Sequence, residues 1–191
     1  YLEAMADAGI VVFDKTGTLT RGNFVVSGVY PQGISKDALL EMAALAEGYS
    51  DHPISRSLKE AWGNDLDLSR LSEIHEVAGH GVEAKVDGRQ VLAGNEKLLR
   101  KHGIECPACA QVGTVIHVVL EGSYAGCIVI SDEIKPDAAK AIRALHAAGV
   151  RKTVMLTGDR RAVGEAVAQE LGLDEVHTEL LPAQKVAQVE R

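Results

Sequence analysis

The chain has 191 residues, of which 46% are hydrophobic and 25% are charged, the balance of a soluble globular protein and not of a disordered chain. Its 20 Lys and Arg residues against 27 Asp and Glu residues give a net charge of −7, which argues against nucleic-acid binding. No apolar run approaches the roughly 18 residues of a membrane-spanning helix. Three cysteines do not make a disulfide framework, so a reducing compartment fits best.

Three segments near the start of the chain have clear patterns. Residues 9–14 form a short apolar run that ends in Asp14, which predicts a buried strand whose tip delivers a carboxylate into a turn. Apolar residues recur at helical spacing over residues 35–49, behind Ser35 as a suitable N-cap. A second helix is predicted after Pro53, because proline suits the first turn of a helix.

The middle of the chain carries two hairpin signatures. Residues 73–86 and 89–93 flank an Asp-Gly pair, and residues 114–120 and 123–131 flank a Glu-Gly pair. Together with the two helices, these hairpins predict an antiparallel sheet with helical cover.

After Pro136 the pattern alternates between helix and strand, which is typical of a parallel sheet. The predicted elements are helix 137–148 ending before Gly149, strand 153–156, helix 161–171 ending at Gly172, and a short strand near Val176. The strand at residues 9–14 has no parallel partner in the middle region, so we expect it to join this sheet.

The expected fold class is therefore α/β with an insertion. A discontinuous domain of residues 1–27 and 128–191 contains the parallel sheet, and an α+β domain of residues 28–127 is inserted into it.

The stretch from Asp14 to Thr20 reads Asp-Lys-Thr-Gly-Thr-Leu-Thr. A carboxylate at a strand tip can attack phosphorus while the N–H groups and hydroxyls of a Gly- and Thr-rich turn hold the phosphoryl oxygens. Lys15 adds a positive charge for the phosphate. The simpler interpretation is a Thr-rich turn that only ends a strand.

These seven residues are the signature of the P-type ATPases, ion pumps that form an aspartyl-phosphate in a haloacid-dehalogenase-like domain, and the chain resembles this family. The stretch Thr157-Gly158-Asp159 precedes a predicted helix and resembles the family's second phosphate-binding element. Lys185 matches the family's phosphate-neutralising lysine, although the family often has an acid where Gln184 stands. The simpler interpretation of Thr157-Gly158-Asp159 is a helix N-cap, and the simpler interpretation of Lys185 is a solvated surface lysine.

Thr16 separates two groups of relatives. Soluble phosphatases of the same superfamily have a second aspartate at this position as general acid and base, a role that threonine cannot take. The resemblance therefore implies an acyl phosphate on Asp14 that persists until another domain supplies the hydrolytic base.

The inserted region resembles the nucleotide domain of the heavy-metal subgroup of these pumps. The matching residues are Glu47, His52 before Pro53, Gly79, Gly81, Gly94 and Asn95. The resemblance implies that His52 borders the adenine of ATP, that Glu47 contacts its amino edge, and that the glycines admit backbone close to the nucleotide, with Asn95 as a further contact. Taken singly, His52 caps a helix and a Gly-x-Gly stretch is a turn or bulge. Residues 50–57 and 78–87 look most similar to the zinc, cadmium and lead branch, which we prefer to the copper branch.

The resemblance also implies the cofactors and partners. ATP is the substrate, and Mg²⁺ is held by Asp14 and the Thr16 carbonyl, with a third ligand downstream of Arg191. Lys15, Thr157, Asp159 and Lys185 position and neutralise the phosphate. Membrane helices that carry the heavy-metal ion and an actuator domain belong to the same parent protein. We therefore expect a monomeric cytoplasmic fragment of a membrane protein that binds nucleotide and no nucleic acid.

Two other functions stay open. A soluble phosphatase of the same superfamily would turn over p-nitrophenyl phosphate, and a non-catalytic nucleotide-sensing module would bind ATP without labelling at Asp14. Residues 132–137 resemble the family's hinge, or form a solvated charged junction.

Cys106 and Cys109 have the C-x-x-C spacing of a redox pair or half a zinc site, against the simpler reading of incidental thiols in a loop. Cys127 and His102 are candidates to complete such a site, although the apolar context of Cys127 favours a core residue. The scattered histidines, His117 among them, are expected to be structural or exposed.

Overall fold

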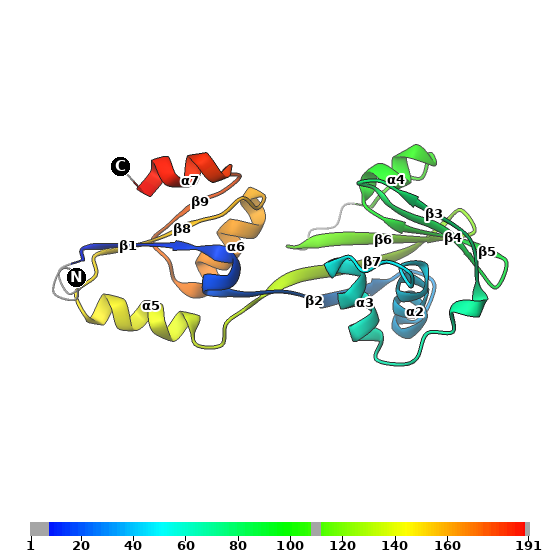
Figure 1. Cartoon of the computed structure of the whole chain (residues 1–191), viewed down its shortest axis with the longest axis horizontal. Helices are drawn as coiled ribbons and strands as arrows, with labels where there is room; N and C mark the ends of the chain where they lie inside the picture. The colour runs from blue at the N-terminus through cyan, green and yellow to red at the C-terminus, as the bar shows by residue number, and fades with distance from the viewer. Residues whose placement is uncertain (1–7, 108–111, 190–191) are drawn as a thin grey trace. The chain divides into compact units, whose positions relative to one another are not determined.

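The computed structural model describes residues 8–107 and 112–189 (Figure 1). The chain divides after Asn23 and after Ser131 into a terminal unit, formed by its two ends, and an inserted unit, residues 24–131. The expected boundaries, after residues 27 and 127, lie four residues from these divisions.

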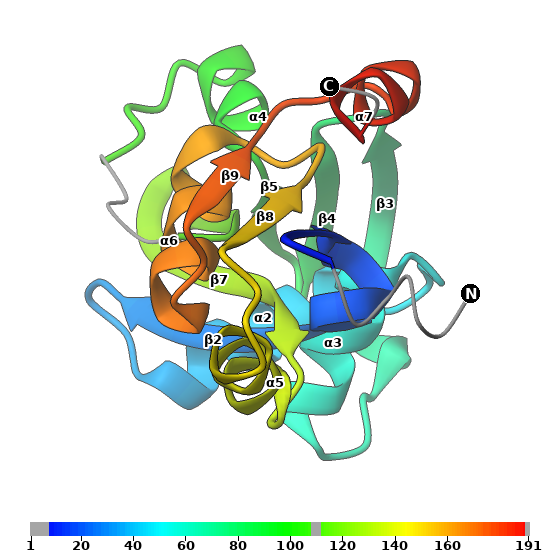
Figure 2. The ribbon, with the colours of Figure 1, turned by 90° about the vertical axis from the view of Figure 1, so that its left-hand side faces the viewer.

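The terminal unit is built on a parallel three-stranded sheet in the order β1-β8-β9. Figure 1 labels all three strands, and Figure 2 shows β8 and β9 side by side. Its strands are β1 (Ile10–Asp14), β8 (Lys152–Leu156) and β9 (Glu175–His177). Asp14 is the register partner of Leu156, so the turns after both strands leave the same edge of the sheet. The expectation that the first strand joins the C-terminal parallel sheet is confirmed.

Two helices cover this sheet through one apolar cluster. α5 (Ala138–Ala147) contributes Ile142, and α6 (Arg161–Leu171) contributes Leu171, both packed with Met155 of β8. α6 ends where Gly172 takes a left-handed conformation with φ 71°, as its sequence predicts. The third helix, α7 (Pro182–Val189), follows β9 and was not predicted.

The inserted unit contains a six-stranded sheet in the order β2-β7-β6-β5-β4-β3. Its strands are β2 (Thr20–Pro31), β3 (Leu71–Val77), β4 (Gly81–Val86), β5 (Arg89–Gly94), β6 (Thr114–Leu120) and β7 (Ser123–Ile134). β2 and β7 begin in one unit and end in the other. β2 was not predicted. The expectation of one strand over residues 73–86 was wrong, because the chain turns at residues 78–80, where Gly79 has φ 69°.

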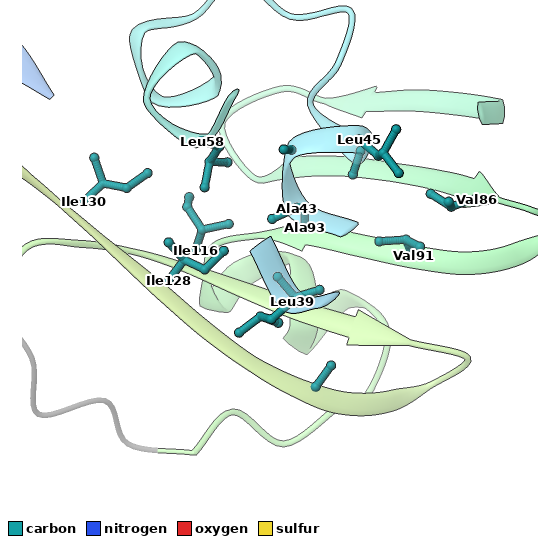
Figure 3. Packing of buried hydrophobic residues seen from close by; sticks show 14 residues of the cluster. Leu39, Ala43, Leu45, Leu58, Val86, Val91, Ala93, Ile116, Ile128 and Ile130 are labelled. Carbon is teal, nitrogen blue, oxygen red and sulfur yellow. The ribbon is translucent and has the colours of Figure 1, made fainter. Parts of the chain in front are cut away.

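The core of the inserted unit lies between this sheet and two helices, α2 (Lys36–Ala46) and α3 (Pro53–Trp62). Figure 3 shows Leu39 and Leu58 from these helices beside sheet residues such as Ile116. Both helices begin as their sequences predict. The Ser35 hydroxyl accepts a hydrogen bond from the Ala38 N–H, and Pro53 occupies the first turn of α3.

Three short elements complete the described part of the chain. They are the turn η1 (Lys15–Leu19), the 3₁₀ turn η2 (Leu68–Arg70) and the helix α4 (Glu96–Lys101). The expected class, an α/β unit that carries an α+β antiparallel insertion, is confirmed. None of the helices in the described part of the chain has the length and hydropathy needed to span a membrane.

Candidate functional site

Asp14 stands at the C-terminal end of β1 and is paired with a lysine from the other end of the chain. The Nζ atom of Lys185 in α7 lies 2.5 Å from Asp14 Oδ1. The Asp14 side chain is 49% exposed and the Lys185 side chain is 30% exposed, so the pair is open to solvent and accessible to a ligand. The strand therefore presents a carboxylate whose charge is partly neutralised by a neighbouring ammonium group.

Lys15, the next residue, is turned into the protein. Its side chain is only 5% exposed, and its Nζ lies 3.3 Å from Asp132 Oδ2 and 2.9 Å from Asp159 Oδ2. A buried ammonium group is tolerated only when carboxylates compensate the lost hydration. The sequence predicts that this positive charge faces a phosphate, whereas in the structure the Lys15 ammonium group contacts two protein carboxylates.

Asp132 is the centre of a small polar network that sequence reasoning missed. Its side chain is 4% exposed. Oδ2 also lies 2.6 Å from the Thr20 hydroxyl, and Oδ1 accepts a hydrogen bond from the Gly22 N–H at 3.0 Å. Asp132 thus ties both ends of η1 together. The alternative of a solvated junction is wrong for this residue.

Thr157, Gly158 and Asp159 follow β8 at the same edge of the sheet. Thr157 is buried, and its hydroxyl accepts a hydrogen bond from the Asp159 N–H at 3.1 Å. The Thr157 N–H donates to the His177 carbonyl at 2.9 Å, and its own carbonyl accepts from the Leu180 N–H. Gly158 packs closely, since an added Cβ would lie 3.2 Å from the Leu180 carbonyl oxygen. These contacts fix the loop that presents Asp159.

Asp159 links this loop to Lys15. Among the described residues, its buried Oδ2 atom has no hydrogen-bond partner, so the contact with Lys15 is an ion pair without hydrogen-bond geometry. The structure therefore brings Asp14, Lys15, Asp159 and Lys185 together, with Asp132 as the added member.

Asp14 and Thr16 carry the oxygen atoms that the sequence predicts as Mg²⁺ ligands. Thr16 is exposed and has extended backbone angles within η1, and Gly17 takes a positive φ of 79°. Carboxylate and carbonyl oxygens are the donors that Mg²⁺ takes, usually one or two of them beside substrate oxygens. Among residues 8–107 and 112–189 no three His, Cys, Asp or Glu side chains gather as a metal site. The Asp14 carboxylate and the Thr16 carbonyl are donors of this chemical kind.

Glu47 and His52 lie at the ends of α2 and α3. Glu47 is 8% exposed, and its carboxylate accepts a hydrogen bond from the Ser55 hydroxyl at 2.6 Å. Burial raises the pKa of Glu47, an effect that Ser55 opposes and the nearby negative charge of Glu76 in β3 reinforces. His52 caps α3, because its Nδ1 accepts from the Ile54 N–H at 3.2 Å. The helix-capping interpretation of His52 is therefore confirmed.

Gly81 and Gly94 face each other across β4 and β5. A Cβ on Gly81 would lie 2.2 Å from the Ala93 carbonyl oxygen, and one on Gly94 would lie 2.2 Å from the His80 carbonyl oxygen. Packing within the sheet therefore already requires both glycines. Gly79 differs, since an added Cβ would meet open space.

Asn95 joins the same corner to α4. Its Oδ1 caps the helix by accepting from the Lys97 N–H at 3.0 Å, and its Nδ2 donates to the Gly79 carbonyl at 2.8 Å. The four residues Gly79, Gly81, Gly94 and Asn95 thus form one corner of the inserted unit.

Comparison with known proteins gives this geometry a context. The protein-family model described as haloacid dehalogenase-like hydrolase matches residues 9–191. The cadmium, zinc and cobalt-transporting ATPase of Bacillus subtilis is 49% identical over 191 residues, and the zinc-transporting ATPase of Synechocystis is 46% identical over 192 residues. Each alignment covers 100% of this chain and 27% of the relative, so the chain spans about a quarter of their length.

A solved structure agrees with these relatives. The crystal structure of a zinc-transporting PIB-type ATPase in the E2.Pi state matches with a TM-score of 0.82 and 35% identity, covering 98% of this chain and 32% of that one. The chain is thus similar in sequence and fold to part of heavy-metal-transporting P-type ATPases. Since the family model accounts for nearly all of it, the chain belongs to the haloacid dehalogenase-like hydrolase family.

Proposed function

We propose that this chain is the nucleotide-binding and phosphoryl-accepting part of a heavy-metal-exporting P-type ATPase, in which Asp14 accepts the γ-phosphate of ATP. The observation that carries the proposal is the half-exposed Asp14 carboxylate at the end of a parallel strand, held at 2.5 Å by Lys185. Catalytic groups in open α/β sheets lie at the carboxyl ends of the strands.

The chemistry is a nucleophilic displacement at phosphorus. Lys185 engages Oδ1 of Asp14, so the attack falls to Oδ2, which forms a bond to the γ-phosphorus while the bond to the bridging oxygen of ADP breaks. The products are ADP and an acyl phosphate on Asp14. Lys185 offsets the charge that the equatorial oxygens gain.

The other residues of the terminal unit position the reacting groups. Lys15, anchored between Asp132 and Asp159, holds η1 against the loop at residues 157–159. The Thr157 hydroxyl and the backbone of Gly158 lie at the same edge and supply donors to the phosphoryl oxygens. Asp14 and the Thr16 carbonyl would hold Mg²⁺, which when bound neutralises charge on the transferred phosphate.

ATP is held by the inserted unit in this proposal. His52 supplies an imidazole beside the adenine, Glu47 accepts from its amino group, and Gly79 leaves room for close approach of the ligand. Gly81, Gly94 and Asn95 form the corner next to it.

The exported ion is a divalent metal such as zinc or cadmium, as the names of the most similar transporters suggest. Its path lies in membrane helices of the parent protein, and hydrolysis of the acyl phosphate depends on an actuator domain of that protein. The chain then works on the cytoplasmic side of the membrane, as a monomer.

Acid-stable labelling tests the proposal. The full-length protein that carries this chain is incubated with γ-labelled ATP and Mg²⁺, quenched in acid, and treated with hydroxylamine, which cleaves acyl phosphates. We expect hydroxylamine-sensitive label in the parent and none in Asp14→Asn. Asp137→Asn, an exposed acid before α5, is the matched control and keeps the label.

Two outcomes would replace the proposal. Rapid multiple turnover of p-nitrophenyl phosphate by the isolated chain identifies a soluble phosphatase. ATP binding with no label under any condition identifies a nucleotide-sensing module.

A further inference from the structure

The C-x-x-C motif of the sequence does not complete a metal site in the described part of the chain. Cys106 Sγ lies 3.3 Å from Nε2 and 3.5 Å from Nδ1 of His117, so the sulfur atom faces the ring and is not in line with either nitrogen. Among residues 8–107 and 112–189 no three His, Cys, Asp or Glu side chains gather as a metal site. Cys127 is buried, as expected for a core residue, and Cys109 lies outside the described residues.

Residues 15–18 form a tight turn directly after Asp14. Thr16 has φ −72° and ψ 124°, and Gly17 has φ 79° and ψ −13°, the angles of a type II β-turn with glycine at its third position. Glycine suits that position because a side chain is strained at a positive φ. The central peptide of a type II turn has the opposite orientation to that of a type I turn. This conformation therefore decides which way the Thr16 carbonyl points.

The two ends of η1 are anchored, but its corner is exposed. The Lys15 carbonyl accepts a hydrogen bond from the Thr20 N–H and lies 3.0 Å from the Thr20 hydroxyl. Lys15 and Leu19 are buried, whereas residues 16–18 between them are exposed. Packing therefore does not hold the corner in place, and its rigidity depends on hydrogen bonds.

Lys135 supplies a side-chain hydrogen bond to this corner from a position 118 residues further along the chain. Its Nζ atom donates to the Gly17 carbonyl at 3.0 Å, and its backbone N–H donates to the Leu19 carbonyl, also at 3.0 Å. In the part of the chain that the structure describes, no other side chain forms a hydrogen bond to residues 16–18. One residue thus contacts two alternate carbonyls of the turn.

The backbone of Lys135 is itself held in a defined position. Its carbonyl accepts a hydrogen bond from the Ala138 N–H at 3.0 Å, at the start of α5. Pro136 follows it, and a residue before proline is restricted to extended conformations. The Lys135 side chain therefore reaches toward Gly17 from a fixed point.

The charge of Lys135 is directed at this carbonyl and not at a carboxylate. Among residues 8–107 and 112–189, no Asp or Glu side chain forms an ion pair with its Nζ atom, in contrast to Lys15. A hydrogen bond from an ammonium group is stronger than one between neutral groups. It also polarises the peptide that accepts it, and the N–H of that peptide belongs to Thr18.

We propose that Lys135 is a positioning residue for phosphoryl transfer, which holds the Gly17 carbonyl so that the turn after Asp14 keeps one conformation. The inference rests on the proposed function, in which Asp14 accepts the phosphoryl group. Lys135 acts through the turn and does not touch the phosphate. Misplacement of reacting groups by about 1 Å can cost about 100-fold in rate, so the conformation of an exposed turn beside the nucleophile affects the reaction.

Lys135→Met tests this role, because it removes the ammonium group and keeps the backbone N–H that binds the Leu19 carbonyl. Rapid-quench labelling of the full-length protein with γ-labelled ATP should show a maximal rate lower by about 10–100-fold, the usual cost of losing an outer-shell partner. The ATP concentration for half-maximal rate should not change. Lys135→Arg should recover most of the rate, since a guanidinium group also donates to a carbonyl. Lys140→Met, at an exposed position of α5, is the control and should label like the parent.

Two further measurements separate positioning from a direct contact with the phosphate. The Mg²⁺ concentration for half-maximal labelling should rise by about tenfold in Lys135→Met, because the Thr16 carbonyl, a proposed Mg²⁺ ligand, lies in the loosened turn. Nitrogen-15 NMR of the 191-residue chain, without ATP or metal, should show a shifted Thr18 amide in Lys135→Met. The amides of β8 should not shift, which shows that the unit remains folded.

A parent-like labelling rate in Lys135→Met would overturn the proposal. So would an unshifted Thr18 amide, because the contact with Gly17 would then be absent in solution. Slow labelling with parent-like Mg²⁺ dependence would also overturn it, in favour of a direct contact with the phosphate. Failure of the proposed function gives a different result, since the parent protein itself would then carry no label on Asp14.

Discussion

Lys185 and Asp14 are 171 positions apart in the sequence, and the structure brings the lysine Nζ to 2.5 Å from the aspartate Oδ1. The pair joins the first strand of the parallel sheet to the last helix of the described chain. Because both side chains are partly exposed, an ion pair of this kind contributes little to folding, about 0–1 kcal/mol. We therefore expect the Lys185–Asp14 pair to affect the rate of phosphoryl transfer more than the free energy of unfolding.

Replacement of Lys185 separates its contribution to folding from its contribution to phosphoryl transfer. Lys185→Met should change the free energy of unfolding by less than about 1 kcal/mol. It should slow labelling of Asp14 by about 100-fold or more, because a positioned charge at the transferred phosphate is lost. Rapid-quench labelling measures the rate. Lys140→Met, at an exposed position of α5, should label like the parent, and equal rates in the two variants would remove Lys185 from the site.

Asp132 should matter most for stability. Asp132→Ala leaves the buried Lys15 with one carboxylate and breaks the contacts to Thr20 and Gly22. We expect a loss of about 3–5 kcal/mol, the usual cost of breaking a buried ion pair. Urea unfolding and amide exchange in β1 measure it. The neighbouring pair of Glu133 with Arg21 is exposed, so Glu133→Gln should cost at most about 1 kcal/mol, and a similar loss in both variants would contradict this account.

Glu47 predicts a pH dependence of the inserted unit. Burial raises its pKa above the ordinary value of 4.5, so the folded state holds this proton more tightly than the unfolded state. The stability from this group is present below about pH 4.5 and is lost as the pH rises toward its raised pKa.

Glu47→Gln keeps an acceptor for the Ser55 hydroxyl but cannot ionise. Its unfolding free energy, measured from pH 4 to pH 8, should therefore fall less with rising pH than that of the parent. Glu60→Gln, at an exposed position of α3, is the control, because it removes the same negative charge from the surface. A parent-like pH profile in Glu47→Gln would show that this carboxyl is not the titrating group.

His52 can be tested for capping and ligand binding separately. His52→Ala removes the acceptor for the Ile54 N–H and should cost about 0.5–2 kcal/mol of stability. It should also weaken ATP binding by about tenfold if the imidazole touches the base. His52→Asn restores a good N-cap without the ring. Calorimetric titration should then find recovered stability with ATP binding still weak, and full recovery of both would limit His52 to capping.

The glycines of the inserted unit should fall into two classes. Gly81→Ala and Gly94→Ala place a Cβ against backbone oxygen atoms and should destabilise the unit by about 1–3 kcal/mol. Gly79→Ala meets open space and carries only the cost of its positive φ of 69°. Gly88→Ala is the control, because Gly88 lies outside the candidate site, has a φ of 77° and leaves open space for an added Cβ. It should therefore lose a similar free energy of unfolding. Weaker ATP binding in Gly79→Ala than in Gly88→Ala indicates ligand approach at Gly79, and equal affinities would contradict it.

Much of the fold follows from local sequence. The apolar run before Asp14, the cap at Ser35, the first-turn proline at position 53 and the stop at Gly172 each act within one or two turns of chain. Their effects can therefore be predicted without a structure. The break at Gly79 was missed, since the strand pattern continues through it. β2 was missed as well, since its neighbour in the sheet, β7, is distant in sequence. α4 was also missed, although its cap at Asn95 is local.

The sequence by itself determined which residue types this chain offers: a carboxylate at a strand tip, a Gly- and Thr-rich turn after it, and the residues that we propose to bind nucleotide. Only the tertiary structure decided which groups the charged side chains contact. It buries Lys15 between Asp132 and Asp159, brings Lys185 to Asp14, and sets Cys106 against His117. The physical reason is that local pattern fixes backbone conformation, whereas the partners of a buried charge or thiol are chosen by closure of the chain over more than a hundred residues or across a sheet.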